Sequence, residues 1–147
     1  MKTYLPLLAT LFASCCLFKA YTQESPGLTL VNSMPSEGAV EITLHLDGNV
    51  QVEFWDKTYL QVQLSVEKSN LSRSQLKSLV RLGFFQVAAA GNANGLALFM
   101  PKAATPVTVG GMKPCNELAF KITVPRHVRV KVHNERSDSL ALEAARL

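Results

Sequence analysis

The sequence predicts a mostly β domain with one short helix. Residues 40–46 and 60–67 alternate apolar and polar side chains with a period of two, which is typical of a half-buried strand. Residues 70–83 instead carry apolar side chains at helical spacing. A chain of 147 residues has room for one modest hydrophobic core, so we expect a single domain.

Three strands are predicted in succession in the first half of this domain. Residues 40–46 form the first, and Asp47-Gly48-Asn49 supplies turn residues that predict a hairpin with residues 50–55. Residues 56–58 interrupt the pattern before the strand at 60–67. Three adjacent strands with one apolar face make a stable sheet.

The predicted helix spans residues 70–83. Ser72 followed by Gln75 fits a capping box, and Gly83 suits the position after the last turn. Leu76 and Leu79 belong to the apolar stripe that faces the core.

The sequence pattern in the second half of the chain also predicts strands. Glycine, proline and asparagine residues separate short apolar stretches, which predict strands at 84–90, 96–100, 107–109, 117–124 and 128–133.

The two ends of the chain are expected to lie outside the β-rich domain. We interpret residues 1–20 as a signal peptide, because Lys2 precedes an apolar stretch at 5–18 that is shorter than the roughly 20 residues of a membrane-spanning helix. Residues 21–27 are expected to be a polar linker, residues 28–134 the β-rich domain, and residues 135–147 a tail or short helix.

The cysteines in the leader allow two interpretations of how the leader is processed. Cys15 and Cys16 follow Phe-Ala-Ser, which resembles a bacterial lipobox, so lipidation of one of them is the alternative to plain cleavage. Only lipidation would place the protein on a membrane. Cys115 has no cysteine partner in the expected exported chain, so no disulfide scaffold is predicted.

The overall charge predicts no nucleic-acid partner. The chain is formally +4, and without Lys2 and Lys19 its 13 basic residues face 11 acidic ones. The sequence contains no nucleophile elbow, P-loop, dinucleotide fingerprint or zinc-protease motif. We therefore predict a protein that is not an enzyme, with no cofactor and no metal site.

Two groups of residues are candidates for binding. His127, Arg129, Lys131 and His133 share one face of the predicted last strand, with the three intervening valines expected toward the core. This basic stripe would suit an anionic glycan, phosphate or acidic partner, or would simply be a solvated face. Two histidines about 20 Å apart on one strand are too distant to share a metal ion.

Trp55 and Tyr59 form the second candidate. They lie at the ends of two predicted strands, where they would either cap the edge of the core or contact a ligand.

Two segments resemble those of a known group. VQVEFWDKTYLQVQLSV and KITVPRHVRVKVHN are similar to segments of the exported putative-adhesin, or GIN head-domain, proteins of Bacteroidetes and related bacteria. In that group a Trp-Asp-Lys strand end and an x-Ile-x-Val-Pro-x-x-Val-x-Val segment recur. The resemblance implies a stacked-sheet or short solenoid-like β domain at the cell envelope, and it supplies no catalytic residues.

Together these observations predict an exported domain, located in the periplasm, on the outer membrane surface or outside the cell, that acts through surface contact without catalysis. Its partner would be an envelope protein or glycan, and the oligomeric state stays open. One alternative is a small-molecule or glycan binder that uses Trp55 and Tyr59. Another is a hydrolase-like enzyme, which would require His45 or His127 to be buried beside a carboxylate and a nucleophile.

Overall fold

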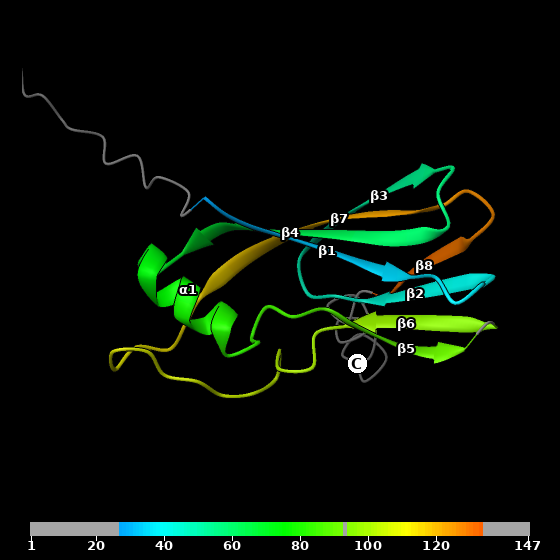
Figure 1. Ribbon diagram of the computed structural model, residues 1–147. Coiled ribbons are helices and arrows are strands. Elements are labelled where there is room, and N and C mark those ends of the chain that lie inside the picture. Colours follow the sequence, from blue (N-terminus) through cyan, green and yellow to red (C-terminus); the bar gives the residue numbers. More distant parts are fainter. Residues whose placement is uncertain (1–26, 93, 134–147) are drawn as a thin grey trace, which may run out of the picture.

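The computed structural model describes residues 27–92 and 94–133, which form two stacked β-sheets with a short helix at one end (Figure 1). The predictions for the signal peptide, the lipidation cysteines, most of the linker and the C-terminal tail lie outside these residues. The predicted fold class, a mostly β domain of stacked sheets with one helix, is confirmed.

The first sheet has the strand order β1-β4-β7-β3. Its strands are β1 (Leu28–Pro35), β4 (Tyr59–Ser69), β7 (Asn116–Pro125) and β3 (Asn49–Trp55). β4 pairs antiparallel with both β1 and β7, whereas β3 pairs parallel with β7.

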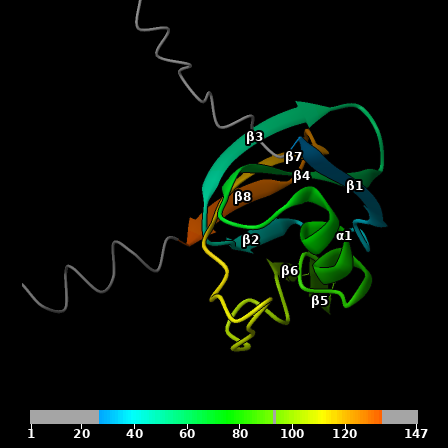
Figure 2. The same cartoon turned by 90° about the vertical axis from the view of Figure 1, so that its left-hand side faces the viewer.

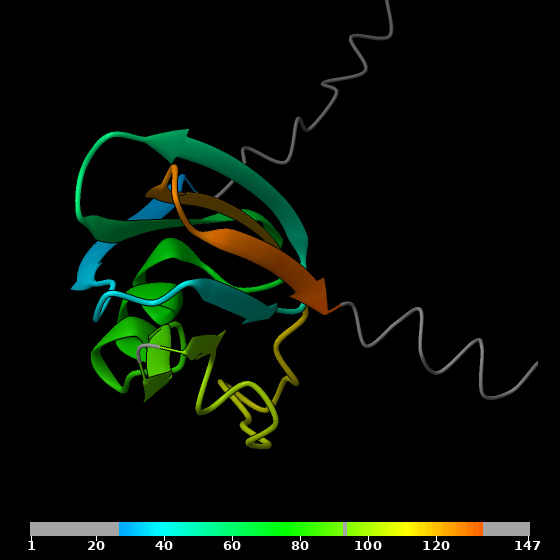
Figure 3. The same ribbon diagram turned by 90° about the vertical axis from the view of Figure 1, so that its right-hand side faces the viewer.

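The second sheet has the order β5-β6-β2-β8. Its strands are β5 (Ala88–Asn92), β6 (Gly95–Phe99), β2 (Glu41–His45) and β8 (Arg129–His133). β2 pairs parallel with both β6 and β8, and β5 pairs antiparallel with β6. The relation between the two sheets is clearest from the right-hand side (Figure 3).

The core lies between the sheets because alternate residues of each strand point to one side. β4 shows this most clearly, since every second residue is buried. The buried residues of the central strands are Ile42, Leu44, Leu60, Val62, Leu64, Val66, Leu96, Leu98, Phe120, Ile122 and Val124. Their removal from water is the main stabilising contribution to the domain.

Helix α1 (Arg73–Arg81) covers one end of the two layers (Figure 2). The predicted capping box is present: the Ser72 hydroxyl accepts a hydrogen bond from the Gln75 N–H, and the Gln75 side chain accepts one from the Ser72 N–H. Leu76 and Leu79 are buried in the core, as the apolar stripe predicted.

The predicted hairpin between residues 40–46 and 50–55 is wrong. β2 and β3 belong to different sheets, because both edges of β2 already pair with β6 and β8. The Asp47–Asn49 turn instead carries the chain from one sheet to the other. The return from β7 to β8 makes the opposite crossing. Because β3 pairs parallel with β7 and β2 pairs parallel with β8, the two strand pairs form the solenoid-like feature of the fold.

Other boundaries also differ from the sequence prediction. β1 was not predicted, β3 and β4 are separated by β7 rather than adjacent, and β5 begins at Ala88 after a turn that contains Phe84 and Phe85. The stretch 107–109 contributes only an isolated bridge between Val109 and Met112.

Candidate functional site

An aromatic pair lies at one end of the first sheet. The Trp55 indole N–H donates a hydrogen bond of 2.9 Å to the Tyr59 carbonyl oxygen, which closes the loop between β3 and β4. The two rings meet edge to face, with centroids 4.7 Å apart and planes at 68°. Both residues are half-buried and neither belongs to the core cluster. They therefore pack against each other on the surface rather than capping the core.

Lys57 completes this aromatic corner, by which we mean Trp55, Lys57 and Tyr59. Its Nζ atom lies 4.6 Å from the centroid of the Trp55 ring and donates a hydrogen bond of 3.1 Å to the Tyr59 hydroxyl. Attraction between an ammonium group and an aromatic face holds such a side chain in place. The corner thus presents a fixed positive charge beside two partly exposed rings.

The outer face of the first sheet continues from this corner as a polar surface. Trp55 shares this face with Gln51 and Glu53, and Tyr59 shares it with Gln61 and Gln63, because alternate residues of a strand point to one side. The register places Glu53, Thr123, Gln61 and Ser33 in one row and Gln51, Lys121, Gln63 and Val31 in the next.

Side chains on this outer face contact one another across the strands. Lys121 forms an ion pair of 3.1 Å with Glu53, whose carboxylate also accepts a hydrogen bond of 3.4 Å from the Gln51 amide. The hydroxyls of Thr29 and Ser65 lie 3.3 Å apart. Most of the face therefore consists of amide and hydroxyl groups that can both donate and accept hydrogen bonds.

The structure brings the start of the basic stripe to the same end of the domain as the aromatic corner. The Arg126 N–H donates a hydrogen bond of 3.1 Å to the Trp55 carbonyl oxygen, and the Arg126 guanidinium contacts the Asp56 carboxylate at 2.7 Å. His127 follows in the same turn, which leads into β8. No local sequence pattern indicates this proximity, because it depends on the parallel pairing of β3 with β7.

The basic stripe differs in part from its prediction. Arg129, Lys131 and His133 are exposed on β8, but His127 precedes the strand and is an exposed turn residue. The expectation that all three valines face the core is wrong for Val132, which is 52% exposed because β8 is an edge strand. Lys131 also forms an ion pair of 3.0 Å with Glu41 on β2.

One residue that the sequence had not connected with the stripe lies next to it. The imidazole rings of His45 and His133 have centroids 5.1 Å apart, because the two residues are partners in the β2–β8 pairing. No sequence signal indicates this pair, since the residues belong to distant strands.

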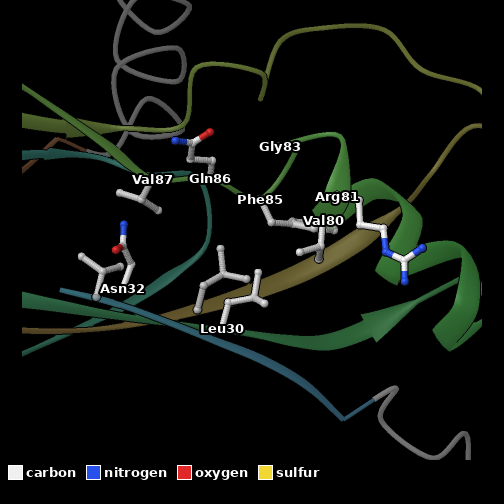
Figure 4. Close-up of a pocket in the computed structure, with 10 residues that line it drawn as sticks. Leu30, Asn32, Val80, Arg81, Gly83, Phe85, Gln86 and Val87 are labelled. Carbon is white, nitrogen blue, oxygen red and sulfur yellow. The ribbon is translucent and has the colours of Figure 1, made fainter. Parts of the chain in front are cut away.

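A cavity of about 310 Å³ lies between the first sheet and the segment that follows α1 (Figure 4). Its walls are mostly apolar, with Leu30 and Asn32 of β1 facing Val80, Phe85 and Val87. No histidine, cysteine or carboxylate is among the described residues that line it. The cavity therefore offers space for an apolar group without acid–base or nucleophilic side chains.

The condition that would favour a hydrolase is not met. His45 and His127, which would have to be buried beside a carboxylate and a nucleophile, are both exposed. Within residues 27–92 and 94–133, no group of three or more histidine, cysteine, aspartate or glutamate side chains is arranged to hold a metal ion. Cys115 is exposed with a free thiol. The described part of the chain contains no helix with the length and hydropathy needed to cross a membrane.

Comparison with known proteins shows only weak similarity between this chain and two solved structures. No protein-family model matches the sequence, and no curated protein matches it either. A solved structure from Bacteroides fragilis, described as a "putative adhesin", shares 14% identity at a TM-score of 0.40 over 73% of this chain. Another from Clostridium sporogenes, described as a "putative cell adhesion protein", shares 8% identity at a TM-score of 0.38 over 72% of this chain.

The chain spans 40% and 45% of the lengths of these two structures. At these values the likeness identifies neither a family nor a function. Membership of the adhesin-like group, which the sequence motifs suggested, stays a prediction.

Proposed function

We propose that this chain is an exported, non-enzymatic domain that acts by surface contact, and that it binds an acidic glycan of the cell envelope through the outer face of the first sheet. The observation that carries the proposal is the aromatic corner at the end of this face. Trp55, Lys57 and Tyr59 bring two partly exposed rings and an ammonium group within contact distance of one another.

The chemistry of the face matches that of a sugar. A pyranose ring has apolar C–H faces that pack on aromatic rings and hydroxyl groups that exchange hydrogen bonds with amides and hydroxyls. The corner supplies the aromatic surface, and amides are supplied by Gln51 on β3 and by Gln61 and Gln63 on β4. Because the Trp55 N–H is already bonded to the Tyr59 carbonyl, the indole is held in one orientation before any ligand arrives.

The charges near the corner favour a carboxylate or another anionic group on that sugar. Lys57 has no carboxylate partner among the described ion pairs, whereas Arg126 is paired with Asp56. A carboxylate that approaches Lys57 would find an ammonium group already held in place by the two rings. Arg129 extends the positive charge along the adjacent strand.

The binding experiment uses an oligogalacturonate as the probe for an acidic glycan. In an NMR titration of the full chain, we expect the Trp55 indole and the Gln61 and Gln63 side-chain amides to shift together. Lys57→Ala should weaken binding, while Lys77→Ala, which removes an exposed lysine from α1, should not. Shifts confined to β8 or to the cavity, or equal effects of the two lysine variants, would contradict the proposed face.

Export is tested separately by intact mass. After plain cleavage, protein recovered from an envelope or culture fraction should lack residues 1–20; a mass that instead begins at Cys15 or Cys16 and includes a diacylglyceryl unit would indicate lipidation of that cysteine. Full-length protein with Met1 recovered from cytosol would contradict export and would leave the glycan proposal to its own test.

A further inference from the structure

The outer face of the second sheet places two imidazoles side by side. His45 ends β2 and His133 ends β8, and the two are direct partners in the parallel pairing of these strands. The two strands lie side by side in the ribbon view of Figure 3. Their ring centroids are 5.1 Å apart and their planes are inclined by 51°. Both residues are exposed.

The backbone fixes this juxtaposition. The β2–β8 ladder runs in unbroken register from Glu41 opposite Arg129 to His45 opposite His133. On its other side β2 pairs with β6, which makes it a central strand of the sheet. The separation of the two histidine Cα atoms is therefore set by the ladder, while the rings can turn about their side-chain bonds.

The distance suits coordination of one metal ion by both rings. An imidazole nitrogen binds a late first-row divalent metal at about 2.0–2.1 Å, and the ring centroid lies about 1.1 Å behind that nitrogen. Two rings that meet a metal at a tetrahedral angle then have centroids about 5.2 Å apart, which is close to the observed 5.1 Å.

We propose that His45 and His133 form a surface site for a divalent transition metal of the imidazole-binding type, Zn²⁺, Ni²⁺ or Cu²⁺. Neutral imidazole is the commonest protein ligand for these ions. Two protein ligands leave coordination positions open to water or to a donor from another molecule. This proposal is independent of the glycan proposal, because the histidine pair lies on the other sheet.

The surroundings of the pair are compatible with a bound cation. Lys131 on the same face of β8 has its charge compensated by Glu41 at 3.0 Å. Phe99 of β6 is the partner of His45 on the opposite side and contributes no charge. Arg129 lies at the far end of the strand, four residues from His133.

The test uses Zn²⁺ as the probe and NMR of the histidine rings in the full chain. At pH 7.5 we expect the ring resonances of His45 and His133 to shift together and to saturate at the same Zn²⁺ concentration. His127, the third exposed histidine, is the internal control and should not follow them. Residue-specific signals also separate this site from zinc bound to the exposed Cys115 thiol.

Calorimetric titration of variants then measures affinity. His45→Gln and His133→Gln should each weaken Zn²⁺ binding by at least about tenfold, since even the loss of an outer partner costs a metal site that much. His127→Gln and Cys115→Ser should leave this binding unchanged.

Shifts of only one of the two rings, shifts of all three histidines alike, or undiminished binding in either single variant would overturn the proposal. If a variant fails to fold, the ring shifts of the unmodified chain still decide it.

Discussion

Gly48 lies against the main-chain carbonyl of Leu118, so closely that a Cβ atom at position 48 would be 2.5 Å from that oxygen. This contact occurs where the chain crosses from β2 to β3 and passes the start of β7. Because the obstacle is backbone, it cannot turn aside as a side chain would. The crossing between the two sheets therefore requires a glycine at this position.

We expect Gly48→Ala to destabilise the domain by about 1–3 kcal/mol, the usual cost of forcing an extra carbon into a packed site. Thermal unfolding monitored by circular dichroism would measure this as a fall in Tm. Gly95→Ala is the matched control, because the nearest non-neighbour atom to its added Cβ is 4.0 Å away. Equal Tm values for the two variants would contradict the close contact at Gly48.

The core of β4 gives a second prediction. Leu64 is 2% exposed and lies between the two sheets, so Leu64→Asp buries a carboxylate without a cationic partner. An unpaired buried charge costs several kcal/mol against a total stability of about 5–15 kcal/mol, so we expect loss of cooperative unfolding. Gln63→Asp, on the neighbouring outward position, should retain a cooperative transition. A cooperative melt of Leu64→Asp near the parent Tm would show that this residue is not in the core.

The N-terminus of α1 gives a third prediction. Ser72→Ala removes the hydroxyl that accepts the Gln75 N–H, and loss of such a cap costs about 1 kcal/mol. Ser78→Ala, within the same helix, removes only a hydrogen bond to the Ser74 carbonyl and should change stability little, since alanine favours helix. Urea denaturation would resolve the difference, and a larger loss for Ser78→Ala would contradict the assigned cap.

The local sequence pattern predicted the individual strands and the helix better than it predicted which strands pair with one another. The alternation at 60–67 and the capping residues at 72 and 75 act through near neighbours, so strand and helix follow from the sequence. β1 escaped prediction because its pattern is weak: Asn32 interrupts the inward side and Val31 is 59% exposed on the outward side. An edge strand pairs on one side only, so it can form with a less regular alternation of apolar and polar residues.

Pairings between distant strands could not be predicted in the same way. The turn residues at 47–49 are compatible with a hairpin and with a crossing from one sheet to the other. The chain makes the crossing because both edges of β2 already pair with other strands. The contacts of His133 and Arg126 depend on such pairings, whereas the aromatic corner forms within residues 55–59. His133 meets His45, and Arg126 meets Trp55, through parallel strands whose register no local signal reveals.

A fourth prediction concerns the ion pair between Lys68 and Glu117, which lie 2.9 Å apart at the surface. The hydrogen bond that Lys68 donates to the Glu117 carboxylate is the main cause that raises the pKa of Lys68 above 10.5, and the charge of Glu67 contributes less. The raised pKa means that any stabilisation by this pair is present below pH 10.5 and is lost as the pH rises through the folded-state value. In an NMR titration of the lysine side chains, Glu117→Gln should lower the pKa of Lys68 more than Glu67→Gln does. The reverse order would contradict the hydrogen bond.

The last prediction concerns the exposed side chains of β8. Arg129→Gln combined with Lys131→Gln should leave the fold intact, because both side chains project from an edge strand into solvent. Lys131 is 67% exposed and its partner Glu41 28%, so solvent screens much of their attraction, and loss of an exposed pair costs about 0–1 kcal/mol. Glu41→Gln breaks the same ion pair from the β2 side and is the matched control. Its Tm should fall by a similar small amount, since the two variants lose the same interaction. A loss of several kcal/mol in the double variant alone would mean that Arg129 or Lys131 is packed against the domain, and would refute the exposed geometry of the stripe.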